Sequence, residues 1–373
     1  MPKRKPAIVI GTKAELIKMS PVMAALKRSG PGYSSIFTGQ HNIDQELKEN
    51  RLSRPDYVFD PSAKGRGRFL SKAAASIWSV KAFFWIRKAL SKLKPSVVLV
   101  HGDTMTTAAG ALAAKSLGLT LAHIEAGLRS GSVREPFPEE ISRRIADKLS
   151  DYFFCPTWHS AQNLLAEGKP RSRIFVTGNT NIDAASKKIS MSQKKRRGKY
   201  LIAKIHRHEN VTSRKRLSDF ISAISASPLP VVLILPENLE RQLAKFGLQV
   251  PRNAKTIKYL PQKKFLTLLA SATAILTDAG GETEEACWLG VPCIQFRERA
   301  ERQEAEISGA AIRTTDSKKI LEAIVLAKGG KWKIPLEARK AFGTGVAAKE
   351  IVGEICKILS EKNTKRNVFI KER

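Results

Sequence analysis

Residues 275–286 read ILTDAGGETEEA and carry the clearest chemical pattern in the chain. An apolar run ends at Thr277 and Asp278, two glycines follow, and a helix-forming stretch then begins with acids. This order predicts a strand, a tight turn and a helix start, whose N–H groups suit a diphosphate. The glycines let a ligand approach the backbone, and Glu284 or Glu285 can accept hydrogen bonds from sugar hydroxyls. The segment therefore indicates a nucleotide-sugar site, although an ordinary strand-to-helix turn has the same composition.

Charged and imidazole side chains also follow other apolar segments of the chain. A lone Asp after a strand, such as Asp103 before Thr104, is more often a helix cap, and a lone His is more often structural. Six such segments together are harder to explain by solubility, and they predict a catalytic cleft. They are GTKAE at 11–15, HGDT at 101–104, HIEAGLR at 123–129, REPFPEE at 134–140, GNT at 178–180 and HRHEN at 206–210.

Short apolar segments with the length of β-strands alternate with amphipathic stretches at 15–28, 70–93 and 106–117. Such alternation predicts parallel sheets that are covered by helices on both faces. The expected strands lie at 7–10, 34–38, 97–101, 120–124, 152–155, 174–177, 200–205, 231–235, 256–259, 274–276 and 293–296.

The strand-helix pattern restarts after a lysine- and arginine-rich stretch at 187–198, which predicts two domains. We expect an α/β fold of two Rossmann-like, doubly wound parallel-sheet domains facing a cleft, with ligands beyond the carboxyl ends of the strands. The first domain, 1–188, would carry the catalytic carboxylates, and the second, 189–360, would bind the nucleotide. A helical stretch at 346–359 would pack back across the hinge, and 361–373 would form a basic tail.

The chain has 373 residues and a formal net charge of +31 at pH 7. Its densest basic clusters are 194–197 and 362–373, and it lacks the patterns of RNA-binding sheets, helix-turn-helix motifs and zinc fingers. We therefore expect the charge to attract anionic substrates rather than a specific nucleic acid. No apolar run reaches the roughly 18 residues of a membrane span, and the segment 7–10 is too short for a signal-peptide core. The four cysteines lack metal-ligand spacing, so we expect reduced thiols, no metal ion and a cytoplasmic protein.

Eight motifs, taken in their order along the chain, resemble those of the UDP-N-acetylglucosamine 2-epimerase family. They are GTKAELIKMSP, TGQH, HGDTMTT, HIEAGLRS, PFPEEISRRIAD, VTGNTNIDA, HRHEN and LTDAGGETEEA. The resemblance covers about residues 6–360 and implies the two-domain glycosyltransferase-B architecture. It also implies conversion of UDP-GlcNAc to UDP-ManNAc, for polysaccharide biosynthesis. We expect a homodimer that needs no cofactor, and the first turn, GTKAEL, is not the GxGxxG of a nicotinamide-binding fold.

The resemblance implies roles for single residues, each at a position that matches a family motif. Asp103, Glu125 and Glu139 match the three catalytic carboxylates of the family, and His206 matches a histidine after a strand of the second domain. The residues implied in substrate binding are Lys13 and Lys18 near the phosphates, Arg207 beside His206, Phe265 against uracil, Gly280 and Gly281 at the phosphate turn, and Glu285 on ribose.

The implied chemistry accounts for these residue types. The C2 proton of the sugar is not next to a carbonyl carbon, so inversion is easier if UDP leaves first and C1 gains cationic character. One carboxylate can stabilise that cation and another can take the C2 proton, which gives a 2-acetamidoglucal to which UDP adds again. Cations and helix dipoles stabilise the leaving diphosphate. Acids that lie close together push their pKa values apart, but which of them is the base and which the acid stays open.

Several positions depart from the family pattern. Ala279 and Thr283 stand where serine and glutamine are usual at the phosphate turn, and Lys13 stands where arginine is usual. Bacterial members bind a second, activating UDP-GlcNAc beside the active site. Ile43 and Glu237 replace a glutamine and a histidine of that second site. We therefore expect that this chain lacks it.

Three functions are compatible with the sequence. The first is a non-hydrolysing UDP-GlcNAc 2-epimerase, an isomerase. The second is a hydrolysing enzyme that releases ManNAc and UDP, or an epimerase of another UDP-HexNAc. The third is a non-catalytic protein that binds nucleotide sugar or nucleic acid. The presence of all three acids and of His206 argues against the third.

Overall fold

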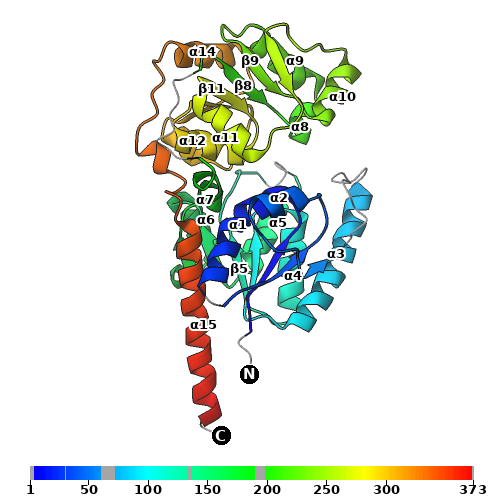
Figure 1. Ribbon diagram of the computed structural model, residues 1–373, viewed down its shortest axis with the longest axis vertical. Helices are drawn as coiled ribbons and strands as arrows, with labels where there is room; N and C mark the ends of the chain where they lie inside the picture. The colour runs from blue at the N-terminus through cyan, green and yellow to red at the C-terminus, as the bar shows by residue number, and fades with distance from the viewer. Residues whose placement is uncertain (1–3, 30, 60–71, 133–136, 190–197, 372–373) are drawn as a thin grey trace. The chain divides into compact units, whose positions relative to one another are not determined.

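The computed structural model divides the chain into two compact units, Met1–Ala184 with Thr344–Arg373, and Ala185–Gly343 (Figure 1). The structure describes the backbone alone in 72–76 and 362–371, and backbone and side chains in 4–29, 31–59, 77–132, 137–189 and 198–361. The basic cluster at 194–197 lies outside the described residues.

The first unit is built around a seven-stranded parallel sheet with the strand order β3-β2-β1-β4-β5-β6-β7. The order runs outward from β1 in one direction and from β4 in the other, so a switch point lies between these two strands. The loops that follow the strands diverge at such a point and leave room for a ligand. The strands are β1 (Ala7–Ile10), β2 (Ser34–Phe37), β3 (Tyr57–Val58), β4 (Val98–His101), β5 (Leu121–Ile124), β6 (Tyr152–Cys155) and β7 (Ile174–Val176).

Helices cover both faces of this sheet. Ile8 and Leu99 pack with α1 and α15 on one face, and Val9 and Val98 pack with α3 and α4 on the other. Because successive strand residues point to opposite faces, β1 must be apolar throughout, and its sequence AIVI is fully buried. The helices are α1 (Lys13–Arg28), α2 (Asp44–Glu49), α3 (Lys72–Leu93), α4 (Met105–Ser116), α5 (Glu139–Leu149), α6 (Trp158–Ala166), α7 (Thr180–Ser186) and α15 (Ala347–Lys371), with a 3₁₀ turn at Arg171–Arg173.

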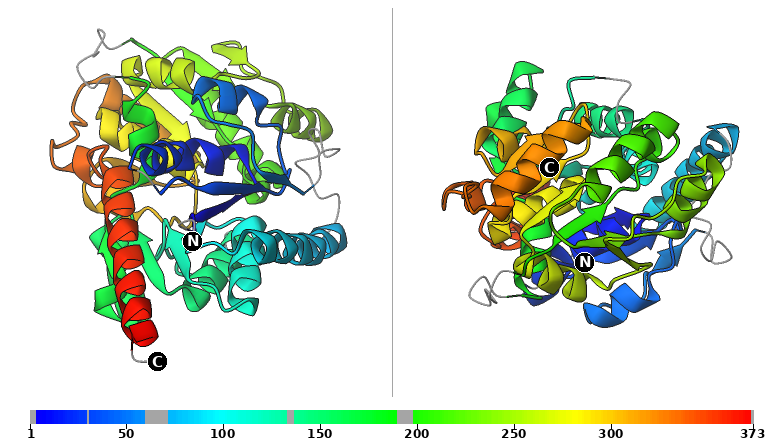
Figure 2. Two further views of the ribbon diagram at one scale, coloured as in Figure 1. Left: turned by 60° about the horizontal axis from the view of Figure 1, so that its bottom comes forward. Right: turned by 90° about the horizontal axis from the view of Figure 1, so that it is seen from above.

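The last helix, α15, belongs to the first unit. It lies beside α1 (Figure 2), and its buried apolar residues belong to the same core as those of α1. The Asp183 carboxylate accepts hydrogen bonds from the N–H groups of Ala347 and Ala348, at 3.1 and 2.8 Å, which satisfies the helix start. The sequence predicts that the second domain extends to residue 360, but the chain returns to the first unit at 344. The backbone of the expected basic tail continues this helix as far as Lys371.

The second unit is built around a six-stranded parallel sheet with the order β10-β9-β8-β11-β12-β13. Its switch point lies between β8 and β11, which end at the HRHEN and DAGG segments. Apolar side chains of the strands, α9, α10 and α14 form its core. The strands are β8 (Leu201–Lys204), β9 (Val231–Ile234), β10 (Ala254–Ile257), β11 (Ala274–Thr277), β12 (Cys293–Gln295) and β13 (Ala311–Arg313). The helices are α8 (His208–Val211), α9 (Arg214–Ser225), α10 (Glu237–Phe246), α11 (Gln262–Ser271), α12 (Gly280–Leu289), α13 (Gln303–Ile307) and α14 (Ser317–Lys328), with a 3₁₀ turn at Ala338–Lys340.

The predicted fold class, α/β with two Rossmann-like parallel-sheet units, is confirmed. Within the described ranges, no helix has the length and apolar character needed to cross a membrane. The same part of the chain holds no group of three or more His, Cys, Asp or Glu side chains placed to bind a metal ion. All four cysteines are free thiols.

Candidate active site

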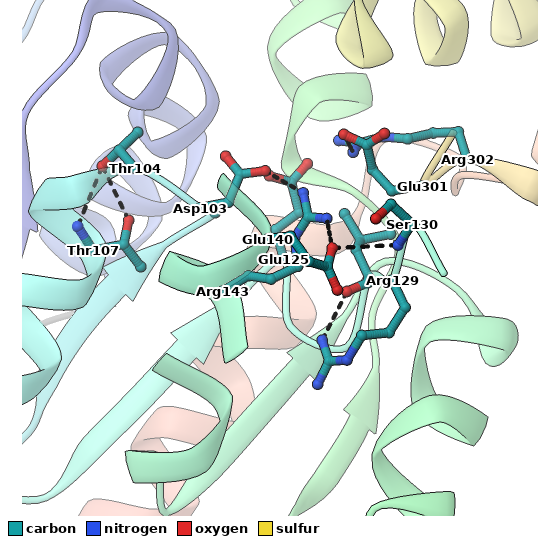
Figure 3. A network of polar contacts seen from close by, with 12 residues as sticks. Asp103, Thr104, Thr107, Glu125, Arg129, Ser130, Glu140, Arg143, Glu301 and Arg302 are labelled. Carbon is teal, nitrogen blue, oxygen red and sulfur yellow. Dashed lines mark hydrogen bonds and ion pairs between the residues drawn. The ribbon is translucent and has the colours of Figure 1, made fainter. Parts of the chain in front are cut away.

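Asp103 follows β4 and contacts α5. Its carboxylate forms an ion pair with Nη2 of Arg143, whose Nη1 donates a hydrogen bond to Oε2 of Glu140 at 2.6 Å (Figure 3). Arg143 is 2% exposed and Glu140 is fully buried, so water screens their interaction little. Arg143 therefore holds the Asp103 carboxylate in one orientation at the end of β4.

Glu139 is the first residue of α5 and directly precedes Glu140. One oxygen of its carboxylate is buried. Residues three and four apart lie on the same face of a helix, so Arg143 lies one turn beyond both acids. Neither Arg143 nor Glu140 was predicted as a site residue, although the spacing of acids and arginines in EEISRR indicates an ion pair on one face of a helix. Residues 133–136, which precede this helix, lie outside the described residues.

Glu125 follows β5 with a left-handed backbone, at a φ of 68°. Such a conformation costs a non-glycine residue roughly 1–2 kcal/mol and is common at functional sites. Its Oε1 accepts hydrogen bonds from Nζ of Lys18 at 2.7 Å and from Nδ2 of Asn179 at 2.9 Å. A Cβ on Gly102, which has a φ of +66°, would lie 3.1 Å from Oε2 of Glu125. The loops after β4 and β5 therefore fit together around a glycine.

A buried charge network supports the backbone next to Asp103. Nε2 of His123 lies 2.7 Å from the carbonyl oxygen of Gly102, and Nδ1 lies 2.7 Å from Oδ1 of Asp147. Both oxygens are acceptors, and the ring bridges them. Nη1 of Arg129 donates to Oδ2 of Asp147 at 2.6 Å. Burial alone would raise the pKa of Asp147, but His123 and Arg129 outweigh it and lower that pKa.

Glu15 joins the loop after β1 to the loop after β4. Its Oε2 accepts hydrogen bonds from the N–H groups of Gly11 at 3.0 Å and Thr12 at 2.7 Å. Its Oε1 accepts one from the hydroxyl of Thr104, the N-cap of α4, at 2.9 Å. Burial raises the pKa of Glu15, and these hydrogen bonds oppose that rise. Because Thr104 follows Asp103, Glu15 also helps to fix the position of Asp103.

Lys13 begins α1, and its ammonium forms an ion pair with Glu46 of α2 at 2.9 Å. Its N–H group donates to Nδ1 of His41 at 3.2 Å. Burial, and then the charge of Lys13, lowers the pKa of His41, which fits a ring nitrogen that accepts. Ile43, two residues further, is 5% exposed and belongs to the apolar core. The structure therefore places Ile43 among apolar side chains rather than beside polar groups.

In the second unit, Asp278 organises the loop after β8. Its buried carboxylate accepts hydrogen bonds from the N–H groups of His206 and Arg207 and from Nδ2 of Asn210, at 2.9–3.1 Å. Nδ1 of His206 lies 2.9 Å from Oδ1. Burial would raise the pKa of Asp278, but the contact with His206 and the hydrogen bonds hold it far below its usual value. His206 remains half-exposed, and Nε2 is its nitrogen that can meet a ligand. Arg207 also reaches Glu301 at 3.1 Å.

Gly280 and Gly281 are the first two residues of α12, as the sequence predicted. The guanidinium of Arg302 lies 3.0 Å from the place that a Cβ on Gly280 would occupy, so a side chain there would displace it. Nε of Arg302 donates to Oε1 of Glu284 at 2.7 Å. Glu284 and Glu285 are the two acids that the sequence offers for the ribose hydroxyls. Because Glu284 is paired with Arg302, Glu285 is the better candidate for that contact.

Glu285 and Phe265 lie on α12 and α11. Glu285 accepts a hydrogen bond from Nε2 of Gln262 at 3.2 Å, and burial, followed by the charge of Glu282, raises its pKa to about 8. Phe265 is 7% exposed, and Nζ of Lys204 lies 5.3 Å from the centre of its ring. Lys204 also forms an ion pair with Glu282. Lys204 and Glu282 were not predicted as site residues from the sequence. A lysine at the end of an apolar strand is nevertheless a pattern that indicates a functional position.

Known proteins that resemble this chain agree with the expected family. A family model described as UDP-N-acetylglucosamine 2-epimerase matches residues 25–356. A UDP-N-acetylglucosamine 2-epimerase of Methanocaldococcus jannaschii is 35% identical over 93% of this chain and 98% of the relative. One of Bacillus subtilis is 32% identical over 95% of this chain and 96% of the relative. The crystal structure of M. jannaschii UDP-GlcNAc 2-epimerase in complex with UDP-GlcNAc and UDP aligns with a TM-score of 0.83 and 33% identity, over 95% of this chain and 99% of that one. This chain belongs to the UDP-N-acetylglucosamine 2-epimerase family.

Proposed function

We propose that the chain is a non-hydrolysing UDP-N-acetylglucosamine 2-epimerase, which interconverts UDP-GlcNAc and UDP-ManNAc. The observation that carries this proposal is the pair of ordered carboxylates, Asp103 and Glu125, after the adjacent strands β4 and β5. Each is held by a cation, Arg143 for Asp103 and Lys18 for Glu125. Two carboxylates fixed at neighbouring strand ends can act on the same sugar ring. One can stabilise positive charge at C1, and the other can take the proton from C2.

The reaction needs an elimination and its reversal. The C1–O bond breaks and its electron pair leaves with UDP, while a carboxylate takes the C2 proton, and the product is 2-acetamidoglucal. Return of a proton to the other face of C2, and attack of the UDP oxygen on C1, gives the epimer. Asp103, Glu125 and Glu139 share these proton transfers and the stabilisation of positive charge at C1. His206 stabilises the leaving diphosphate.

We propose that UDP binds mainly to the second unit. Phe265 would stack on uracil and Glu285 would accept hydrogen bonds from ribose hydroxyls. The start of α12 at Gly280 and Gly281 would bind phosphate, because helix N-termini stabilise anions. Lys13, Lys18 and Arg207 would add positive charge for the diphosphate. The contact of Nδ1 of His206 with Asp278 supports this proposal, since it leaves Nε2 for a phosphate oxygen.

A second, activating substrate site is not part of this proposal. Ile43 lies in the apolar core, and its side chain has no group that can hydrogen-bond a nucleotide sugar. Glu237, which begins α10, carries a negative charge that would repel a diphosphate. We therefore propose that activity depends on substrate bound at one site for each chain.

We propose a cytoplasmic homodimer that supplies polysaccharide biosynthesis. Three large apolar side chains on one face of α3 support self-association: Ile77, Val80 and Phe84 are 57%, 56% and 63% exposed. Their spacing of three and four residues aligns them along the helix. Light scattering after gel filtration tests this, and Phe84→Glu should shift a dimer to monomer.

Proton NMR of the purified protein with UDP-GlcNAc tests the reaction. Appearance of UDP-ManNAc supports the proposal. Free ManNAc with UDP would identify a hydrolysing enzyme. An unchanged UDP-GlcNAc spectrum would indicate either a non-catalytic binding protein or an epimerase of another UDP-HexNAc. The same assay with other UDP-HexNAc sugars separates these two outcomes.

A further inference from the structure

His101 is the last residue of β4 and directly precedes Gly102 and Asp103. It is 1% exposed, and neither of its ring nitrogens has a hydrogen-bond partner among the described residues. A neutral imidazole carries one donor and one acceptor. A buried polar group without a partner lowers the free energy of unfolding, because it has lost its hydrogen bonds to water. The ring therefore lowers folding stability where it stands, which is typical of a residue that serves a site.

The oxygen that His101 can reach is Oε2 of Glu125. Nε2 of the ring lies 3.9 Å from it. A hydrogen bond to a carboxylate has a length of about 2.7–2.9 Å, so an approach of about 1 Å would form one. Lys18 and Asn179 already hold the other oxygen, Oε1. A small rotation of the carboxyl group about that anchored oxygen is the movement required.

We propose that His101 is a positioning residue for Glu125, whose Oε2 accepts a hydrogen bond from Nε2–H of the ring during turnover. The bond fixes the plane of the carboxyl group and favours its ionised form. The inference rests on the proposed epimerase function, in which Glu125 acts on the sugar. His101 itself does not touch the sugar in this proposal.

The surroundings of His101 keep the ring uncharged. Burial lowers the pKa of His101 to about 4, since the opposing charge of Glu125 does not compensate for the loss of water. Lys18 and His123 also lower it, and Asp103 raises it. A neutral ring supplies a directed donor without a second positive charge beside Glu125. Lys18 remains the cation that balances the carboxylate.

Two substitutions separate the donor from the shape of the side chain. His101→Leu fills a similar space without polar atoms, and His101→Gln keeps an N–H donor. We expect His101→Leu to lower kcat about 10–100-fold with KM within about twofold, as loss of a group that supports proton transfer does. The acid limb of kcat/KM should move upward by about one pH unit, because the ionised carboxylate loses a hydrogen bond. In His101→Gln the limb should stay near that of the parent protein.

Thermal unfolding supplies a second measurement. His101→Leu removes two unsatisfied polar atoms, so its melting temperature should equal or exceed that of the parent protein. Val100→Ala, at the neighbouring and fully buried position of β4, is the matched control. It should lower the melting temperature and leave the acid limb unchanged.

An unchanged acid limb in His101→Leu would overturn the inference, and so would a fall in melting temperature comparable to that of Val100→Ala. Glu125→Gln, measured alongside, separates this failure from a failure of the proposed function. Normal turnover of Glu125→Gln would show that Glu125 has no part in the reaction, and the proposed function would fail at this residue. If Glu125→Gln loses turnover while His101→Leu keeps the pH profile of the parent protein, the role of Glu125 stands and that of His101 is refuted.

Discussion

Arg143 links two carboxylates, and Arg143→Met leaves both without its guanidinium. Removal of one partner from a buried ion pair costs about 3–5 kcal/mol, because the other charge stays buried without compensation. Glu140 would keep the hydrogen bond from Nε of Arg144 at 2.9 Å and that from the N–H of Ser130 at 3.3 Å. We therefore expect the lower end, about 3 kcal/mol. For a domain of this size that loss lowers the melting temperature by about 6–12 °C.

Scanning calorimetry of three variants tests this value. Arg144→Met is the matched control, since Arg144 also pairs with Glu140 but is 39% exposed. Exposed pairs contribute about 1 kcal/mol or less, so its melting temperature should fall by less than about 4 °C. The double variant Arg143→Met/Glu140→Met removes both charges and should regain most of the lost stability. Its turnover should stay low, because Asp103 has lost its cation. A fall of less than about 2 °C in Arg143→Met, or a double variant no more stable than the single one, would refute the reasoning.

Five further predictions concern catalysis, binding, stability and charge. Asp103→Asn, Glu125→Gln and Glu139→Gln should each lower turnover about a hundredfold or more in the NMR assay, and near-normal rates in all three would contradict the assignment. Glu285→Ala should weaken UDP binding in calorimetric titration, and unchanged affinity would argue for another nucleotide pose. Because the pKa of Glu285 is about 8 in the folded chain against 4.5 as the usual value, its contribution to stability should be present below about pH 4.5 and be lost as the pH rises to 8. Urea unfolding should show this loss in the parent protein and not in Glu285→Gln. Pure UDP-ManNAc should be converted without added UDP-GlcNAc, and a lag that a trace of UDP-GlcNAc abolishes would reveal a second site. Binding of DNA or RNA should fall steeply with salt and show no sequence preference, and selective binding at physiological salt would contradict this.

The positions of the strand ends could be predicted from the sequence because buried parallel strands are short apolar runs. The segments expected at 7–10 and 152–155 have the bounds of β1 and β6. The edge strand Tyr57–Val58 was missed, since two residues have no periodicity to recognise. Similarly, Ala311–Arg313 has one buried residue out of three and lacks the apolar character of a central strand.

The side chains that hold the site together were harder to predict. Asp278 lies inside the LTDAGG motif, but its role as acceptor for the HRHEN loop depends on the pairing of β8 with β11, in which Leu201 lies opposite Ala274. His101 has the same difficulty, because its contact with Glu125 depends on β4 lying beside β5. Pairing of distant strands is decided by the whole sheet and not by local pattern.

The return of the chain to the first unit has a consequence for the order of folding during synthesis. The core around α1 is completed by α15, which follows the whole second unit in sequence and leaves the ribosome after it. Residues 185–371 take roughly 10–40 s to synthesise at the usual rates of translation. For that time the apolar side of α1, including Leu16 and Met19, is without its covering helix. The second unit, which is continuous in sequence, can fold meanwhile. The N-terminal unit of this chain is therefore the last to be completed, and a nascent chain that stops before residue 347 exposes an apolar surface for chaperones to bind.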